Sequence, residues 1–367
     1  MVARRALALA TVSLAVLSAS CGEGEQLEQD ADPRVDALFS EFMEPGSPGA
    51  VVMVIREGKV LHSRGYGLAD LDRGTPLTPS TPVRLGSMTK AFAAMAIVLL
   101  EERGDLSYDD PVVRWVPELA PFDGITLRHL LNHTSGLPDY YEDSPLEELA
   151  TAPGRELYFA NAEAIAIYES WGEPLFGPGE RYEYSNPGYE VLGLVTERVT
   201  GMRWGEFLAE NLFAPLEMST TVVRDQPDDV VPGAAIGYAP DSASGDWIED
   251  DAHWLNWMVG AGGIYSSLED LYRWDQALWG WAASGDRLDQ VFEPARLNDG
   301  ASSPYGFGWR VSDQLGRDAI HHGGSWVGFR TAISRFVGEE LTVIVLTNNS
   351  GAAAALRDAV AALYLTQ

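Results

Sequence analysis

The chain has 367 residues, of which 46% are hydrophobic and 10% aromatic, enough for a sizeable core in one large domain or two smaller ones. Its 54 acidic and 25 basic side chains give a net charge of −29, which repels nucleic-acid phosphates and anionic lipid headgroups. We therefore expect no nucleic-acid partner, and we interpret the acidic surface as a solvated one.

Residues 1–20 are typical of an export signal, with two arginines before an uncharged, mostly apolar stretch. That stretch is shorter than the about 20 apolar residues of a transmembrane helix. The only cysteine, Cys21, follows directly, so the segment resembles a bacterial lipoprotein signal, although Ser18 stands where such signals usually have Leu. We expect an exported protein. It is either a lipoprotein of the cell envelope (outer membrane, periplasmic face), held by a polar tether at residues 21–34, or a periplasmic or secreted protein.

The remaining chain, residues 35–367, is expected to form a single domain. Strands near both ends and helices in the middle predict one sheet built from about 35–104 and 260–367, with an inserted, mostly helical region at about 105–259. A site would then lie in the cleft between the two parts. In chain order, we expect a helix from residue 35, strands at 50–55 and 60–67, a buried helix at 91–100, helical stretches at 127–131 and 191–199, a helix at 268–281, strands at 329–336 and 341–347, and a closing helix at 352–365.

Ser87 and Lys90 stand three residues apart at the start of the buried helix, which is expected to end near Arg103 with a glycine just past it. Residues i and i+3 lie on one face of a helix, so the lysine amine would lie beside the serine hydroxyl. The helix N-terminus also offers free N–H groups where an oxyanion would develop. Because S-x-x-K is common by chance, a surface Ser and Lys beside a core helix is the alternative.

Tyr184 and Asn186 lie in a stretch flanked by prolines, residues 181–189, that is predicted to be a loop. A phenol near a lysine can have its pKa lowered from about 10 and act as a base. An asparagine amide can hold a substrate carbonyl. The alternative is a tyrosine-rich packing loop.

A third stretch, residues 319–329, contains the paired glycines Gly323 and Gly324. Glycines on a strand mark close approach by a ligand or another backbone, so a strand edge here could bind an acyl substrate and supply an oxyanion N–H. Trp326, which follows Ser325, is a candidate for the acyl pocket. The alternatives are a glycine turn and ordinary packing of the tryptophan.

Together these stretches resemble the three signatures of the serine β-lactamase/penicillin-binding superfamily: S-x-x-K at Ser87, Tyr-Ser-Asn at Tyr184 and His-Gly-Gly at His322. The branch resembled holds class C β-lactamases, D-alanyl-D-alanine carboxypeptidases, D-aminopeptidases and β-lactamase-like esterases. Residues 130–138 and 260–271 also resemble this branch. The resemblance implies a mixed α/β, β-lactamase/transpeptidase-like fold, with a central antiparallel sheet flanked by helices.

The resemblance also implies a role for each matched residue. Ser87 would be the acylated nucleophile, and Lys90, neutral or sharing a proton with Tyr184, would help to deprotonate it. Tyr184 would act as general base and then protonate the leaving group. Asn186 would orient the substrate and the lysine. The backbone N–H groups of Ser87 and Ser325 would form the oxyanion hole.

His322 stands where many relatives of this branch have the lysine of a K-T-G motif. A lysine is a permanent cation for a substrate carboxylate, whereas a histidine is charged only in part near neutral pH. Gly323 also lacks the hydroxyl of a threonine. With Gly324, these residues favour the D-aminopeptidase and esterase members, and we expect a preference for uncharged esters or amides.

The predicted function is that of a serine hydrolase, working through an acyl-enzyme on a small ester, amide or D-amino-acid peptide. We expect no cofactor and no metal, and membrane contact only through a lipidated N-terminus; the oligomeric state stays open. The alternatives are a class C-like β-lactamase and a catalytically silent protein that binds peptidoglycan or a partner. An α/β-hydrolase would need G-x-S-x-G, which the sequence lacks. His129 and His133 have metal-ligand spacing, but Leu130 replaces the glutamate of H-E-x-x-H.

Overall fold

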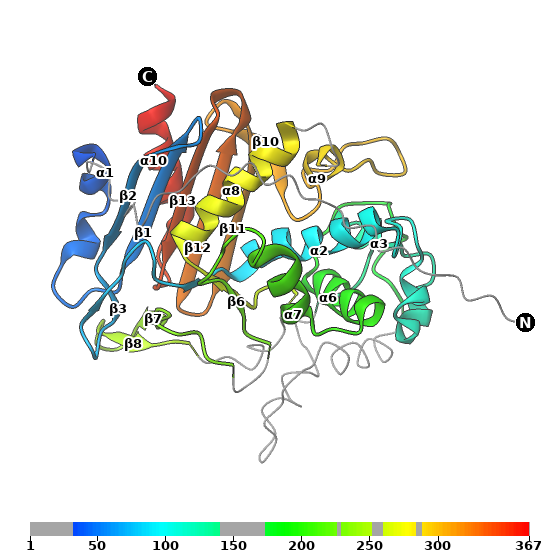
Figure 1. The fold of residues 1–367 in the computed structure, drawn as a ribbon, viewed down its shortest axis with the longest axis horizontal. Coiled ribbons are helices and arrows are strands. Elements are labelled where there is room, and N and C mark those ends of the chain that lie inside the picture. The colour runs from blue at the N-terminus through cyan, green and yellow to red at the C-terminus, as the bar shows by residue number, and fades with distance from the viewer. Residues whose placement is uncertain (1–31, 140–172, 226–228, 252–259, 284–287, 367) are drawn as a thin grey trace, which may run out of the picture.

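A computed structural model describes residues 32–139, 173–225, 229–251, 260–283 and 288–366 (Figure 1). The predicted export signal and Cys21 lie outside these residues. None of the described helices combines the length and the apolar character needed to cross a bilayer.

The predicted antiparallel sheet is confirmed, and it has six strands in the order β10-β11-β12-β13-β1-β2. Every neighbouring pair is antiparallel, and the N-terminal strands join the C-terminal ones where β1 pairs with β13. The strands are β1 (Ala50–Arg56), β2 (Lys59–Tyr66), β10 (Arg310–Gln314), β11 (Arg317–Trp326), β12 (Phe329–Phe336) and β13 (Leu341–Thr347).

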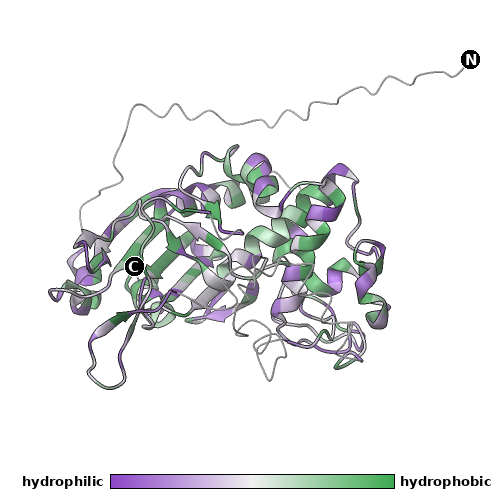
Figure 2. Cartoon of the chain, turned by 90° about the horizontal axis from the view of Figure 1, so that it is seen from below, coloured by the Kyte–Doolittle hydropathy of each residue, from purple (hydrophilic) through white to green (hydrophobic). Residues whose placement is uncertain are grey.

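Strand β1 is buried on both faces because its alternate side chains enter two different cores. Val51 and Met53 belong to the larger core, which the sheet shares with the helical region. Val52 and Val54 belong to a smaller core on the other face, under α1 (Pro33–Leu38) and α10 (Ala353–Leu365). In Figure 2, hydrophobic segments (green) run along the strands of the sheet and along helices of the chain.

The helix after Ser87 is α2 (Thr89–Arg103), and it runs through the larger core. It ends as predicted, because Gly104 adopts the left-handed conformation, with φ +75°, that glycine accepts without strain. The other helices are α3 (Leu127–Leu131), α6 (Asn186–Thr200), α7 (Trp204–Leu208), α8 (Leu268–Ala283) and α9 (Asp289–Phe292).

One expectation needs correction. The stretch predicted as a loop at 181–189 ends at Ser185, because the Ser185 hydroxyl accepts the Gly188 N–H and caps α6, with Pro187 in its first turn. Beside the six-stranded sheet, the described residues also form short strands that pair with one another: β3 (Leu68–Asp70) with β4 (Thr75–Pro76), β5 (Val83–Arg84) and β6 (Val222–Val223) with β9 (Ile264–Ser266), and β7 (Tyr238–Pro240) with β8 (Trp247–Glu249). Of these, β6, β7 and β8 belong to the inserted region.

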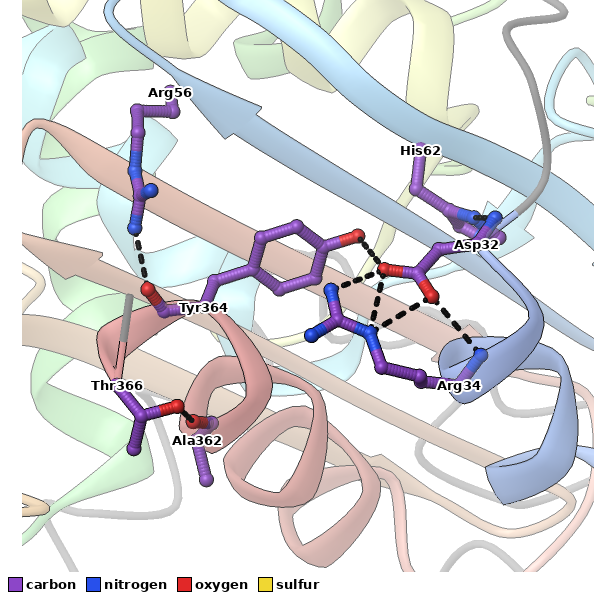
Figure 3. A network of polar contacts seen from close by, with 7 residues as sticks. All are labelled: Asp32, Arg34, Arg56, His62, Ala362, Tyr364 and Thr366. Carbon is purple, nitrogen blue, oxygen red and sulfur yellow. Dashed lines mark hydrogen bonds and ion pairs between the residues drawn. The ribbon is translucent and has the colours of Figure 1, made fainter.

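A polar network joins the first described residues to the sheet and to the C-terminal helix (Figure 3). Asp32 caps α1, and its carboxylate pairs with Arg34 at 2.6 Å and accepts the Tyr364 hydroxyl of α10 at 3.0 Å. The Asp32 N–H donates to Nδ1 of His62 on β2 at 3.1 Å. These contacts fix α1 and α10 on the face of the sheet opposite the helical region.

Candidate functional site

Ser87 lies in a single 3-10 turn, Gly86–Met88, that leads directly into α2. Its side chain is half-buried, while Lys90, in the first turn of α2, is fully buried. Gly86 has φ +54°, and a Cβ there would lie 2.8 Å from the Ser325 nitrogen of β11. This close approach, which glycine alone permits, brings the backbone of Ser87 beside that of Ser325.

The Lys90 amine is held by groups from the helical region. Its Nζ donates to Oδ1 of Asn186 at 2.8 Å and to the Ala261 carbonyl at 3.2 Å. It also lies 4.8 Å from the ring centroid of Tyr184 and 5.6 Å from that of Tyr189. Burial lowers the pKa of Lys90 to about 7, because desolvation penalises the ammonium more than nearby carboxylates stabilise it.

Tyr184 is hydrogen-bonded through its hydroxyl to Ser87, which tends to lower the pKa of the phenol. Desolvation is the larger effect, and it raises that pKa above its usual value of 10. The expectation of a lowered phenol pKa is therefore wrong for the free enzyme. Of this pair, Lys90 is the group that titrates near neutral pH.

Asn186 connects Lys90 to a carboxylate. Its Nδ2 and its backbone N–H both donate to Oδ2 of Asp139 at 3.2 Å. The amide orientation that these bonds require leaves Oδ1 to accept from Lys90. Asn186 thus holds the lysine amine as the sequence predicts.

The edge of β11 faces the Ser87 turn. In the described sheet, β10 pairs with β11 only as far as His321, so the next residues of β11 lie beyond the reach of β10. A Cβ on Gly324 would collide with the Leu85 carbonyl, which also accepts the Thr331 hydroxyl at 2.7 Å. The paired glycines therefore mark a close backbone approach, as predicted.

A cavity of about 390 Å³ opens beside Ser87. Residues from all three predicted motifs line this cavity, together with residues at the start of α10. Lys90 and Asn186 are not among its lining residues. Its lining consists of Ser87, Tyr184, Arg310, His322, Gly323, Gly324, Ser325, Arg330, Thr331 and residues 351–354.

His322 differs from the sequence expectation. It is buried, its Nδ1 donates to the Gly323 carbonyl at 2.7 Å, and its Nε2 accepts the Tyr305 hydroxyl at 2.8 Å. Desolvation, followed by the charge of Lys90, lowers the pKa of His322 to about 3. The expected partial charge near neutral pH is therefore wrong for the free enzyme, because burial and the charge of Lys90 keep the imidazole neutral.

Two arginines that the sequence analysis missed, Arg310 and Arg330, line the cavity. The Arg330 guanidinium donates to backbone carbonyls of the turn between β11 and β12, so Arg310 is the stronger candidate to meet a substrate. Arg310 begins β10, opposite His321 in the register, and its guanidinium lies 5.5 Å from the ring centroid of Tyr184. A guanidinium is permanently charged. An isolated arginine before a predicted strand carries no motif, so only the pairing of β10 with β11 reveals its place.

Glu190 is a second residue that the sequence analysis missed. It is fully buried in α6, and its carboxylate accepts the N–H groups of Gly260 at 3.0 Å and Ala261 at 3.1 Å. These bonds fix the backbone of Ala261, whose carbonyl accepts a hydrogen bond from the Lys90 amine. The sequence does contain a signal for Glu190, because an acidic residue stands within the apolar first half of a helix.

Trp326 is buried, with the Arg84 guanidinium 4.2 Å from its ring centroid. It is not among the described residues that line the cavity. Its predicted place in an acyl pocket therefore stays a prediction, to which this cavity adds no support.

The family model described as Beta-lactamase matches residues 35–366. The chain belongs to this family. It is 33% identical over 344 residues to penicillin-binding protein 4* of Bacillus subtilis (strain 168), with 88% of this chain and 73% of that protein covered. It is 31% identical to a D-aminopeptidase of Gluconobacter oxydans (strain 621H), over 87% of this chain and 58% of the relative. The chain thus spans little more than half of the length of that D-aminopeptidase.

Solved structures agree with this assignment. A penicillin-binding protein homologue from Pyrococcus abyssi, described as octameric, matches with a TM-score of 0.75 and 27% identity, over 91% of this chain and 77% of that one. D-amino acid amidase from Ochrobactrum anthropi SV3 also has a TM-score of 0.75, covers 91% of this chain and 99% of its own, and is 23% identical, which supports the fold alone. The predicted family and the predicted hydrolase class are confirmed.

Proposed function

We propose that the protein hydrolyses amides or esters of D-amino acids through an acyl-enzyme at Ser87. The observation that carries this proposal is Lys90, a fully buried amine with a pKa of about 7, one helical turn from a serine hydroxyl bonded to Tyr184. A base with a pKa near the working pH is the most effective kind. The D-aminopeptidase relatives support the D-aminoacyl class.

In the first step, the Ser87 oxygen forms a bond to the substrate carbonyl carbon. Its proton passes through the Tyr184 hydroxyl to the neutral Lys90 amine. The oxyanion is stabilised by the backbone N–H groups of Ser87 and Ser325, which the Gly86 contact brings together. When the bond to the leaving nitrogen or oxygen breaks, the same proton returns to that atom. Water then releases the acid by the reverse sequence.

The structure favours Lys90 over Tyr184 as the proton acceptor. Because the pKa of Tyr184 is raised, its phenol keeps its proton in the free enzyme and serves as a relay. The edge of β11 supports binding of an extended substrate backbone by strand addition.

A second candidate function is cleavage of a D-peptide that ends in a free carboxylate, and Arg310 is the observation that favours it. Arg310 brings a permanent positive charge to the cavity, so the preference for uncharged substrates inferred from His322 loses its basis. A β-lactam, which also bears a carboxylate, belongs to the same chemical class.

The location of the protein remains a proposal from residues 1–21. An export signal followed by a single lipidated cysteine would place the enzyme in the cell envelope, tethered by the polar segment before α1.

Acylation of Ser87 is the first prediction. Intact-mass analysis after treatment with a p-nitrophenyl ester or a penicillin should show one covalent adduct, because the hydroxyl lies at the cavity beside its base. Ser87→Ala should abolish the adduct, and Ser80→Ala, at an exposed serine nearby, should leave it in place. An adduct that persists in Ser87→Ala would contradict the assignment.

The pH profile is the second prediction. Below its pKa, Lys90 is protonated and cannot accept the Ser87 proton, so kcat/KM should rise about tenfold per pH unit and level off above pH about 7. Because the pKa of His322 is about 3, the inflection in His322→Gln should stay near pH 7, whatever the rate. Loss of the inflection in that variant would assign it to the histidine instead.

Joint action of Lys90 and Tyr184 is the third prediction. Lys90→Ala and Tyr184→Phe should each lower kcat by about 10²–10⁴-fold, and the double variant should be little worse than the poorer single one, since both serve one proton transfer. Tyr272→Phe, which removes a phenol bonded to the Gly58 carbonyl, is the control and should keep full kcat. Multiplication of the two losses would show that the groups act independently.

Selectivity through Arg310 is the fourth prediction. Arg310→Gln should lower kcat/KM for a D-alanyl-D-alanine peptide by about 10–100-fold, the range of a lost charge-assisted hydrogen bond, and much less for its C-terminal amide. Arg317→Gln, at an exposed arginine of β11 paired with Glu339, should change neither. Equal losses for both peptides would rule out recognition of the carboxylate by Arg310.

A further inference from the structure

His133 lies outside the three catalytic motifs, but it contacts residues that belong to them or support them. It follows α3 with a positive φ of 57°, a conformation that residues other than glycine seldom adopt, and its side chain is fully buried. Such a conformation persists only where surrounding contacts stabilise it, and it is frequent near functional sites.

His133 accepts two hydrogen bonds from the residues on either side of Tyr184. The backbone carbonyl of His133 accepts the N–H of Glu183 at 2.9 Å, and its Nδ1 accepts the N–H of Ser185 at 3.1 Å. The residues on both sides of Tyr184 are therefore tied to one histidine. The loop that carries the phenol has little freedom to move away from Ser87.

The imidazole also packs against the phenol itself. Its ring centroid lies 4.3 Å from that of Tyr184 and 4.4 Å from that of Tyr305. Tyr305 in turn donates its hydroxyl to His322 on β11. His133 thus contacts the Tyr184 loop on one side and the tyrosine that supports the third motif on the other.

The bond to Ser185 requires a neutral imidazole. Nδ1 can accept an N–H only when it carries no proton, which places the single ring proton on Nε2. Desolvation, then the charge of Lys90, lowers the pKa of His133 well below its usual value. The acceptor is therefore kept throughout the neutral range.

We propose that His133 is a positioning residue, which holds the Tyr184 hydroxyl in line between Ser87 and Lys90. It acts through Tyr184 and touches no reacting atom. The proposal rests on the proposed function, because it assumes that Tyr184 relays the proton. It adds a residue that the three motifs do not contain, and it explains why a histidine occupies a strained backbone position next to the loop.

The test compares two substitutions of similar size. His133→Asn keeps an acceptor near the position of Nδ1 and tolerates positive φ, whereas His133→Leu removes the acceptor. With a p-nitrophenyl ester as substrate, His133→Leu should lower kcat by about 10–100-fold with little change in KM, as expected for a misplaced catalytic group. His133→Asn should recover most of that loss.

A control separates positioning from stability. His129, in α3, accepts the Thr126 N–H through its Nδ1 at 3.1 Å, the same kind of bond away from the cavity. His129→Leu should lower the midpoint of thermal unfolding and leave kcat unchanged. If His133→Leu does not fold, His133→Gly, which accepts the positive φ without strain, replaces it with the same expected loss.

The deciding measurement repeats the substitution in a Tyr184→Phe background. If His133 acts through Tyr184, His133→Leu should cost almost nothing further there. The same fold loss in both backgrounds, or a kcat for His133→Asn as low as that of His133→Leu, would overturn the proposal. A fully active Tyr184→Phe single variant would instead refute the proton relay through Tyr184, whereas loss of the Ser87 adduct tests the proposed function itself.

Discussion

Burial of the Lys90 amine is the constraint on which the rest of the site depends. An ammonium removed from water is destabilised by several kcal/mol unless polar groups replace its hydration, and otherwise it loses its proton. Among the described residues an amide oxygen, a carbonyl and two aromatic rings hold the amine in place, and the charges of Glu190 and Asp139 offset its desolvation only in part, so its pKa falls to about 7. The groups that hold the amine come from α6, from the residues just before it and from the segment before β9. The position of Lys90 therefore requires the helical region and the sheet to pack together correctly.

Much of the fold could be predicted because the signals are local. The apolar run after Lys90 indicates a buried helix, and Gly104 marks its end. The β-branched run of β13 indicates a central strand. The three motifs, which are also local, place Ser87, Tyr184 and His322 at one cavity.

The remaining residues could not be predicted because their roles arise from tertiary register. Arg310 reaches the cavity only because β10 pairs it with His321. Glu190 and His133 act through backbone N–H groups that are distant in the chain. The charge state of His322 has the same origin: its residue type suggests partial protonation, but burial and the charge of Lys90 favour the neutral ring.

These charge states give the chemical step and the recognition of the substrate different dependences on pH. Lys90 titrates near neutral pH, so the chemical step depends on pH in that range. The groups available to recognise a substrate do not, because a guanidinium is permanently charged and His322 stays neutral. If a lysine replaced His322, a second cation would stand close to the Lys90 amine, and mutual repulsion would lower the pKa of one of them further. A neutral residue at this position thus allows Lys90 to keep its pKa near 7, while the positive charge in the cavity is supplied from the neighbouring strand.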